Sequence, residues 1–171
     1  MFFIKNKRIY ITAILLTGIA VILYVSYNNQ SVLEPQIPLI ESLYKTIPVQ
    51  IGQSEFLAEI ADTEELQGLG LSGRIALNPG EAMLFVFPVP SYYSFWMKDM
   101  KFPIDIVWID ENNTIVTVIS NVTPESYPKS FSSDTNALYV IELSAGTAEA
   151  QNIKKGDRVI FDKNLLKNTS N

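Results

Sequence analysis

Residues 95–110 read FWMKDMKFPIDIVWID, and the second half of this stretch has the composition of a β-strand. From Ile104 to Asp110 the run is rich in β-branched residues, and a second such run follows from Ile115 to Ser120. Between them stands Glu111-Asn112-Asn113-Thr114. Because asparagine tolerates the positive φ that a tight turn requires, the two runs predict a β-hairpin.

Further strands are predicted on both sides of this hairpin, joined by short turns. Thr63 is placed to cap a short helix whose first turn carries Glu64 and Glu65, and Gly70 is placed to end it. A second short helix is predicted over 145–151. Strands at this spacing predict a mainly β domain, a small barrel or sandwich with two short helices. The further strands are expected at Phe56–Ala61, Met83–Val89, Leu138–Leu143 and Arg158–Phe161.

An apolar segment precedes this domain. Residues 9–27 carry no charge and follow Lys5, Lys7 and Arg8; as a helix they would measure about 28 Å, close to the roughly 30 Å of a hydrocarbon core. The segment is longer than the apolar region of a cleaved signal peptide and lacks its small-residue cleavage site, so we expect an uncleaved anchor. The basic flank orients the N-terminus to the cytoplasm and the rest of the chain outside.

The whole chain therefore divides into five parts. We expect a basic cytoplasmic tail at 1–8, a transmembrane anchor at 9–27, a proline-containing linker at 28–47, an extracytoplasmic β domain at 48–165 and a C-terminal tail at 166–171. Three of the 13 bases precede the anchor, so residues 28–171 carry 18 acids against 10 bases. Such a surface is repelled by nucleic acid, which we exclude as a partner.

Composition removes several kinds of chemistry. The chain has 171 residues with no His and no Cys, which excludes a Ser-His-Asp triad, a cysteine nucleophile, disulfides and a zinc site of the His/Cys type. The three glycines of 68–73 follow a predicted helix instead of opening one after a strand, unlike a phosphate-binding loop. No metal and no cofactor is predicted.

Asp105 is the most informative polar residue. It stands in an apolar strand, where an unpartnered polar group costs on the order of 2 to 7 kcal/mol. Arg74 is the best partner, since a guanidinium binds a carboxylate through two parallel hydrogen bonds, and Glu142 of Val140–Leu143 has the same need. The three side chains form either a buried ion pair that fixes loops or a polar ligand site.

Trp96 and Lys98 are expected on one face of a strand, an arrangement that can hold a polar ring or an anion. In the alternative interpretation, Trp96 fills the core and Lys98 extends to water. The candidate ligand-binding residues are thus Arg74, Trp96, Lys98, Asp105 and Glu142.

Five motifs together resemble the domain of unknown function 192 family: GLSGR at 70–74, MLFVF at 83–87, FWMKDMKFPIDIVWID at 95–110, YVIELSAG at 139–146 and KKGDRV at 154–159. The resemblance implies a compact, mostly β domain, often behind an anchor, with no established activity. The chain departs from the family pattern at Leu66-Gln67, Ser72 and Asp99-Met100. The family pattern implies roles for Arg74, Trp96, Met97, Lys98, Pro103, Asp105, Glu142, Gly146, Gly156 and Asp157.

The sequence leaves three functions open. The first is a membrane-anchored binding module for a polar envelope ligand such as a carbohydrate. The second is a hydrolase that uses Asp105 and Glu142 as a carboxylate pair, which requires a carboxyl separation of about 5 to 9.5 Å. The third is a structural or assembly role with an envelope protein partner.

Overall fold

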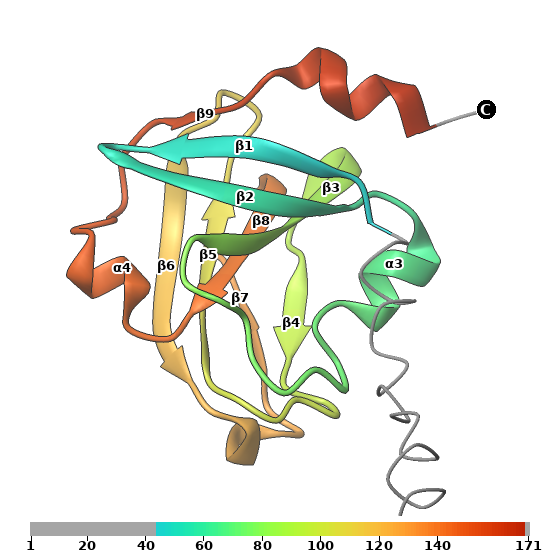
Figure 1. Cartoon of the computed structure of the whole chain (residues 1–171), viewed down its shortest axis with the longest axis vertical. Coiled ribbons are helices and arrows are strands. Elements are labelled where there is room, and N and C mark those ends of the chain that lie inside the picture. Colours follow the sequence, from blue (N-terminus) through green and yellow to red (C-terminus); the bar gives the residue numbers. More distant parts are fainter. Residues whose placement is uncertain (1–43, 170–171) are drawn as a thin grey trace, which may run out of the picture. The chain divides into compact units, whose positions relative to one another are not determined.

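The computed structural model describes residues 44–169. Over these residues, strands alternate with short helices and 3-10 turns, and no helix is long (Figure 1). In chain order they are β1 (Thr46–Ile51), β2 (Ser54–Ala61), α3 (Glu64–Leu69), β3 (Glu81–Ser91), β4 (Ser94–Trp96), β5 (Ile104–Ile109), β6 (Ile115–Val122), η1 (Pro124–Ser126), β7 (Ser130–Ser132), β8 (Ala137–Ser144), α4 (Thr147–Ala150), β9 (Val159–Ile160) and η2 (Lys163–Thr169).

Seven strands form one sheet in the order β6-β5-β8-β3-β2-β1-β9, and β4 pairs with β7 in a separate two-stranded sheet. The β2–β3 pair is parallel, whereas the other pairs in the large sheet are antiparallel. The large sheet curls so far that its two edge strands approach each other (Figure 1). They are joined by an isolated bridge between Thr114 and Arg158.

The fold is therefore mainly β with two short helices, as predicted, in the form of a curled half-barrel. Of the two predicted architectures, the barrel is the nearer one, since one sheet curls on itself and does not pack face to face against an equal sheet. The β5–β6 hairpin is also confirmed. Its turn is held by Asp110, whose side chain accepts the N–H groups of Asn112 and Thr114, and Asn113 has a φ of 59°.

The curled sheet buries apolar side chains on both faces. The inner face packs Ile47, Phe56, Leu84 and Val107 inside the curl, with others around them. The outer face is covered by the loop after α3 and by β4 and β7, and its core includes Met83, Phe85, Trp108 and Met97. This double burial explains why residues 82–85 of β3 are all buried and why the run reads as continuously apolar.

The first helix forms where its signals predict. The Thr63 hydroxyl accepts the Leu66 N–H, Glu64 and Glu65 lie in the first turn, and Gly70 ends the helix at a φ of 49°. The second helix, α4, occupies residues 147–150 of the predicted range, with Gly146 before it.

The first strand of the fold was not predicted. Strand β1 begins at Thr46, inside the range predicted as linker, and Tyr44 is already buried. The alternation of Ile47, Val49 and Ile51 is that of a half-buried strand, but Pro48 suggested a break. The proline is tolerated because β1 is bonded to β9 only through Gln50 and Ile51.

The predicted anchor at 9–27 and most of the predicted linker lie outside the described residues. Within residues 44–169, no helix combines the length and apolar character needed to cross a membrane.

Candidate functional site

A row of side chains crosses four strands on the outer face of the curled sheet. Glu59 of β2 lies opposite Met83 of β3, Met83 lies opposite Glu142 of β8, and Glu142 lies opposite Ile106 of β5. Met83 and Ile106 are fully buried. The sheet therefore holds two carboxyl groups in an otherwise apolar row, one in contact with an arginine and the other not.

Glu142 has a carboxyl oxygen without a hydrogen-bond partner. Its side chain is 5% exposed, and its Oε2 atom is buried and makes no hydrogen bond. Burial raises the pKa of Glu142 to about 8, and the positive charge of Arg74 nearby acts in the opposite direction. At neutral pH most of these side chains therefore carry a proton.

Arg74 is held by Glu59. Its Nη1 donates to Glu59 Oε1 at 2.9 Å and its Nη2 to Oε2, so the guanidinium forms a two-pronged pair with the carboxylate. This pairing raises the pKa of Arg74. The guanidinium also lies 5.3 Å from the ring centre of Tyr44, whose hydroxyl donates to the Gly70 carbonyl at 3.3 Å. The arginine fork is thus occupied inside the protein.

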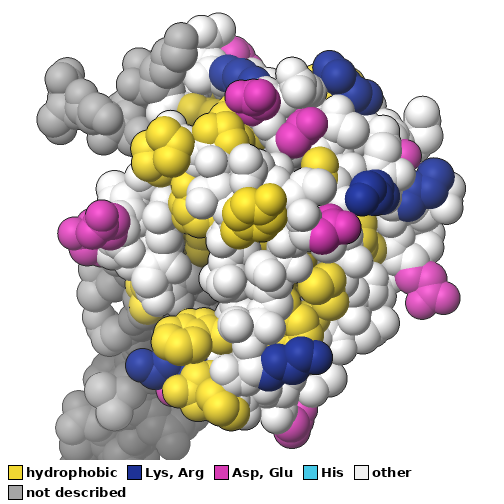
Figure 2. All heavy atoms as spheres, turned by 180° about the vertical axis from the view of Figure 1, so that it is seen from behind, with side chains coloured by type: hydrophobic (Ala, Val, Ile, Leu, Met, Phe, Trp, Pro, Cys, Tyr) yellow, Lys and Arg dark blue, Asp and Glu magenta, His cyan; other side chains and the backbone are white. Residues whose placement is uncertain are grey.

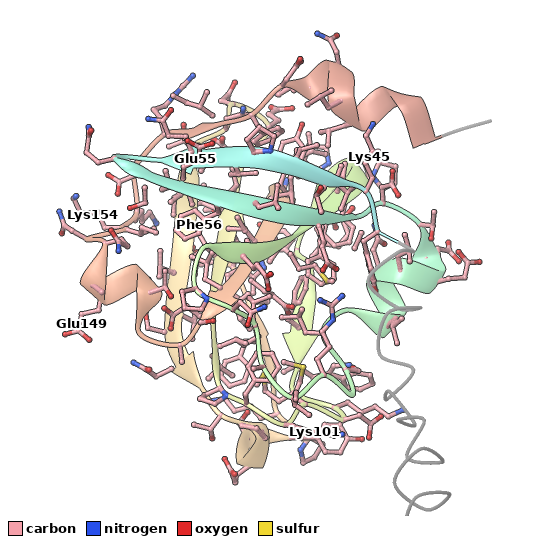
Figure 3. All side chains as sticks on the ribbon, viewed as in Figure 1. Lys45, Glu55, Phe56, Lys101, Glu149 and Lys154 are labelled. Carbon is pink, nitrogen blue, oxygen red and sulfur yellow. The ribbon has the colours of Figure 1, made fainter. Side chains whose placement is uncertain are left out.

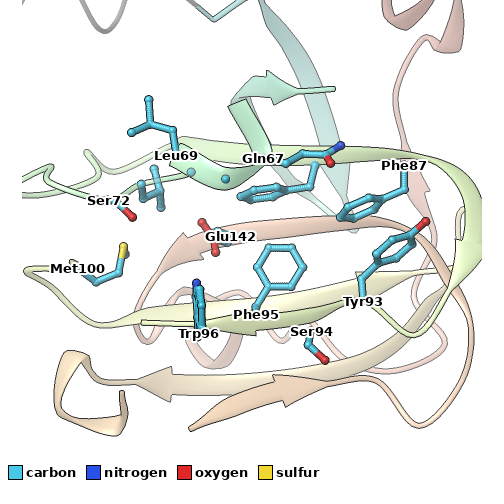
Figure 4. Close-up of a pocket in the computed structure, with 14 residues that line it drawn as sticks. Gln67, Leu69, Ser72, Phe87, Tyr93, Ser94, Phe95, Trp96, Met100 and Glu142 are labelled. Atoms are coloured by element: carbon cyan, nitrogen blue, oxygen red, sulfur yellow. The ribbon is translucent and has the colours of Figure 1, made fainter. Parts of the chain in front are cut away.

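A pocket of about 260 Å³ opens above Glu142. Figure 4 shows the Glu142 carboxyl between the end of α3 on one side and Phe95 and Trp96 on the other. Five aromatic rings, one carboxyl, several small polar groups and the glycine backbone form the walls. The lining residues are Gln67, Gly68, Leu69, Gly70, Leu71, Ser72, Phe85, Phe87, Tyr93, Ser94, Phe95, Trp96, Met100 and Glu142.

One wall of the pocket is built where two of the sequence motifs meet. The Ser72 hydroxyl donates to the Lys98 carbonyl at 3.0 Å, and the Gly73 N–H donates to the Asp99 carbonyl at 2.9 Å. Gly73 and Asp99 both adopt positive φ, at 79° and 59°. The 70–74 loop and the loop after β4 are therefore fixed to each other, which holds the pocket open without a ligand.

Asp105 is buried as predicted, but the predicted partner is wrong. Its carboxylate accepts the backbone N–H groups of Asn121 at 2.8 Å, Gly146 at 3.1 Å and Ala148 at 2.8 Å. It ties β6 and the start of α4 to β5, while Arg74 pairs with Glu59 instead. Asp105 thus acts as a structural acceptor of backbone hydrogen bonds and does not line the pocket.

The proposed carboxylate pair of Asp105 and Glu142 is also contradicted. Along β5, Asp105 lies opposite Leu143 and Ile106 lies opposite Glu142. Since neighbouring side chains of a strand point to opposite faces, Asp105 belongs to the inner face and Glu142 to the outer face. One substrate cannot reach both carboxyl groups, so the hydrolase hypothesis in that form is wrong.

Trp96 and Lys98 are neighbours, as expected. The Lys98 ammonium lies 6.0 Å from the centre of the Trp96 ring. Trp96 is 56% exposed at the rim of the pocket, so it does not fill the core, and its ring meets Tyr127 edge to face. Of the five candidate ligand-binding residues, only Trp96 and Glu142 line the pocket, whereas Arg74, Lys98 and Asp105 lie outside its lining.

The sequence interpretation missed Glu59 and the rings of Phe87 and Tyr93. A signal for Glu59 was present, because the alternation in residues 54–61 places it opposite the buried face of Phe56, Ala58 and Ile60. Phe87 and Tyr93 stack with ring centres 3.5 Å apart, a contact between β3 and the segment before β4. In residues 44–169 no cluster of three acidic side chains has the geometry of a metal site.

Comparison with known proteins gives a family and two solved structures. The DUF192 family model, described as "Uncharacterized ACR", matches residues 47–161. A protein from Sinorhizobium meliloti described as a "putative transcription regulator" is 29% identical, with a TM-score of 0.66, over 69% of this chain and 95% of that one. A protein of unknown function from Novosphingobium aromaticivorans is 28% identical, with a TM-score of 0.64, over 67% and 84%. No curated protein matches.

Proposed function

The chain belongs to the DUF192 family, and from this premise we propose that it is a binding protein that takes a small polar ligand into the aromatic pocket at Glu142. A carbohydrate, as expected from the sequence, is one such ligand. The proposal further places the domain outside the membrane on the anchor expected at 9–27.

One observation carries the proposal. A buried carboxyl oxygen of Glu142 has no hydrogen-bond partner and belongs to a side chain that lines a pocket. Leaving a buried polar group unsatisfied costs about 1 to 3 kcal/mol, a sizeable fraction of the roughly 5 to 15 kcal/mol that stabilises a domain. A ligand that supplies the missing partner recovers this free energy on binding.

The size of the pocket limits the ligand. At about 260 Å³ it is slightly smaller than the roughly 300 to 1,000 Å³ of ordinary ligand pockets, which suits a molecule of about one sugar ring or less. On the face seen in Figure 2, apolar side chains reach the surface in several separate patches among charged ones. This distribution favours a small ligand over a wide apolar partner surface.

This chain has its own version of the pocket. Gln67, Ser72 and Met100 line it, and they are three of the positions at which the sequence departs from the family pattern described above. We therefore base the ligand proposal on the residues of this chain alone. A nucleic-acid ligand is disfavoured because 18 acids face 13 bases in the chain.

Two-dimensional ¹H–¹⁵N NMR of the full-length protein tests the proposal. The indole N–H of Trp96 at the pocket rim can be distinguished from that of Trp108, which donates to the Tyr93 carbonyl at 2.9 Å. A panel of N-acetylglucosamine, choline and small neutral alcohols is titrated. We expect at least one compound to shift the Trp96 indole and the amides of 67–72.

A matched pair of variants completes this test. Trp96→Ala removes a ring from the pocket rim, and Tyr92→Ala removes a similarly exposed ring outside the lining. Binding should weaken only in Trp96→Ala. If every compound leaves the pocket amides unmoved, or if binding shifts only amides elsewhere, the proposed function is refuted.

A further inference from the structure

We propose that the ligand of this pocket carries a positively charged group, a quaternary ammonium or a protonated amine, which rests among the aromatic rings against the Glu142 carboxyl. This inference rests on the proposed function, because it specifies what the same pocket binds. Ring geometry, the charges around Glu142 and the resulting proton balance support it.

The Phe95 ring stands nearly at right angles to two other rings of the pocket. Phe95 meets Phe85 edge to face at 4.8 Å and 87°, and it meets Phe87 at 6.4 Å and 82°. Phe87 and Tyr93 are stacked, with planes 10° apart. Several aromatic rings of differing orientation around one pocket are also a feature of the cages that hold alkylammonium groups, where each contact contributes about 0.5 to 2 kcal/mol.

The lining residues include no lysine and no arginine, and Glu142 is the one acidic side chain among them. The ionisable groups around Glu142 come from three neighbouring segments: Arg74 from the loop after α3, Glu59 from β2 and Tyr44 before β1. Arg74 and Glu59 cancel each other's charge in their two-pronged pair. An ionised Glu142 would therefore give the site a charge of about -1, which a monocation neutralises.

Lys98 is an exposed cation near the rim, 6.0 Å from the Trp96 ring centre. Because this lysine is exposed, solvent and salt screen its repulsion toward a bound cation. An anionic ligand would meet the buried carboxyl directly, without a free guanidinium to bind it. The charge arrangement thus selects a cation over an anion.

Binding of the cation releases a proton. In the empty pocket the Glu142 carboxyl is protonated at neutral pH, since burial raises its pKa to about 8. When the cation enters, the O–H bond of the carboxyl breaks, the proton goes to solvent, and the carboxylate pairs with the cation. Affinity should therefore rise up to about tenfold per pH unit below pH 8 and level off above it.

Choline and its uncharged isostere 3,3-dimethylbutan-1-ol separate charge from shape. Isothermal titration calorimetry of the full-length protein is run at pH 6.5, 7.5 and 8.5, each in two buffers of different ionisation enthalpy. We expect choline to bind at least about tenfold more tightly than the isostere at pH 8.5. We also expect it to release close to one proton at pH 6.5, and fewer as the pH rises above 8.

Two variants assign the proton. Glu142→Gln keeps the shape of the side chain without its charge, and choline binding should weaken and lose both its pH dependence and its proton release. Glu149→Gln is the matched control, because Glu149 is exposed and points outward from α4 (Figure 3). The proton release of the unaltered protein decides the question even if Glu142→Gln fails to fold.

The outcomes distinguish this inference from the proposed function. If the isostere or N-acetylglucosamine shifts the Trp96 indole N–H signal as strongly as choline does, the pocket binds ligands but its preference for a cation is refuted. Choline binding without proton release at pH 6.5, or unchanged in Glu142→Gln, also refutes it. If none of the compounds shifts the pocket amides, both proposals fail together.

Discussion

Replacing Asp105 by alanine should remove a large part of the stability of the domain. Its carboxylate accepts three backbone N–H groups, from Asn121, Gly146 and Ala148, and it is completely buried. Alanine leaves all three donors without this partner. The Ala148 contact is buried and the other two are part-buried. At about 1 to 3 kcal/mol for the first and about 0.5 to 1.5 kcal/mol for each of the others, the free energy of unfolding should fall by about 2 to 6 kcal/mol, compared with a typical total of about 5 to 15.

Asparagine provides a graded test of the same contacts. Oδ1 of Asp105 accepts from Asn121 and Gly146, whereas Oδ2 accepts from Ala148. An asparagine that keeps its oxygen at the Oδ1 position retains two acceptor contacts and loses one. Its cost should therefore be about 1 to 3 kcal/mol, well below that of alanine.

Urea unfolding of the full-length protein, followed by circular dichroism, measures these differences. Amide hydrogen exchange should show the largest loss of protection at Asn121, Gly146 and Ala148. Asp134→Ala is the control, because this side chain is exposed and its contact with Lys155 spans 4.0 Å; it should change stability by less than about 1 kcal/mol. A free energy of unfolding for Asp105→Ala within about 1 kcal/mol of that of the unaltered protein would refute the structural role of Asp105.

Three further predictions follow from the outer face. Burial raises the pKa of Glu142 to about 8 in the folded chain, whereas the unfolded chain loses this proton at lower pH. The free energy of unfolding should therefore fall by up to about 1.4 kcal/mol per pH unit between about pH 5 and 8. Urea unfolding across this range measures the pH profile, which Glu142→Gln should flatten. Arg74→Ala leaves Glu59 unpaired and should lower the free energy of unfolding by about 3 kcal/mol. The same variant should raise the pKa of Glu142, because the guanidinium charge lowers it; an unchanged pKa in carboxyl NMR would contradict this influence. Gly68→Ala, where an added Cβ meets nothing within 4 Å, should stabilise the domain by about 0.5 to 1 kcal/mol and raise its melting temperature. Gly70→Ala should lower the melting temperature, because alanine rarely adopts the φ of 49° found there.

The elements that the sequence predicts best depend on neighbours along the chain. The 104–120 hairpin and the cap of α3 are examples, since the turn asparagine and the capping threonine act within a few residues. The parallel pairing of β2 with β3 was not predicted, because nothing local distinguishes it from an antiparallel return. The curl of the sheet is likewise a property of all seven strands together.

The site shows the same division. That Asp105 needs partners followed from its apolar surroundings, but the partners are backbone N–H groups, which every residue except proline has and which sequence letters therefore do not reveal. The search for a side-chain cation led to Arg74, whose carboxylate partner Glu59 lies 15 positions earlier in the chain. Glu142 was correctly predicted to be buried, since a glutamate between Ile141 and Leu143 is buried with the strand.

The bridge between Thr114 and Arg158 protects the protein against aggregation through its strand edges. An open strand edge offers free N–H and C=O groups to other chains, a common first step toward aggregation. Here the Val159 N–H donates to the Asn113 carbonyl and the Ile115 N–H to the Asp157 carbonyl. The segment that contains β9 therefore pairs with β1 on one side and contacts the start of β6 on the other. A chain cut short before residue 156 would lose these contacts and leave β1 and the start of β6 available for intermolecular strand addition.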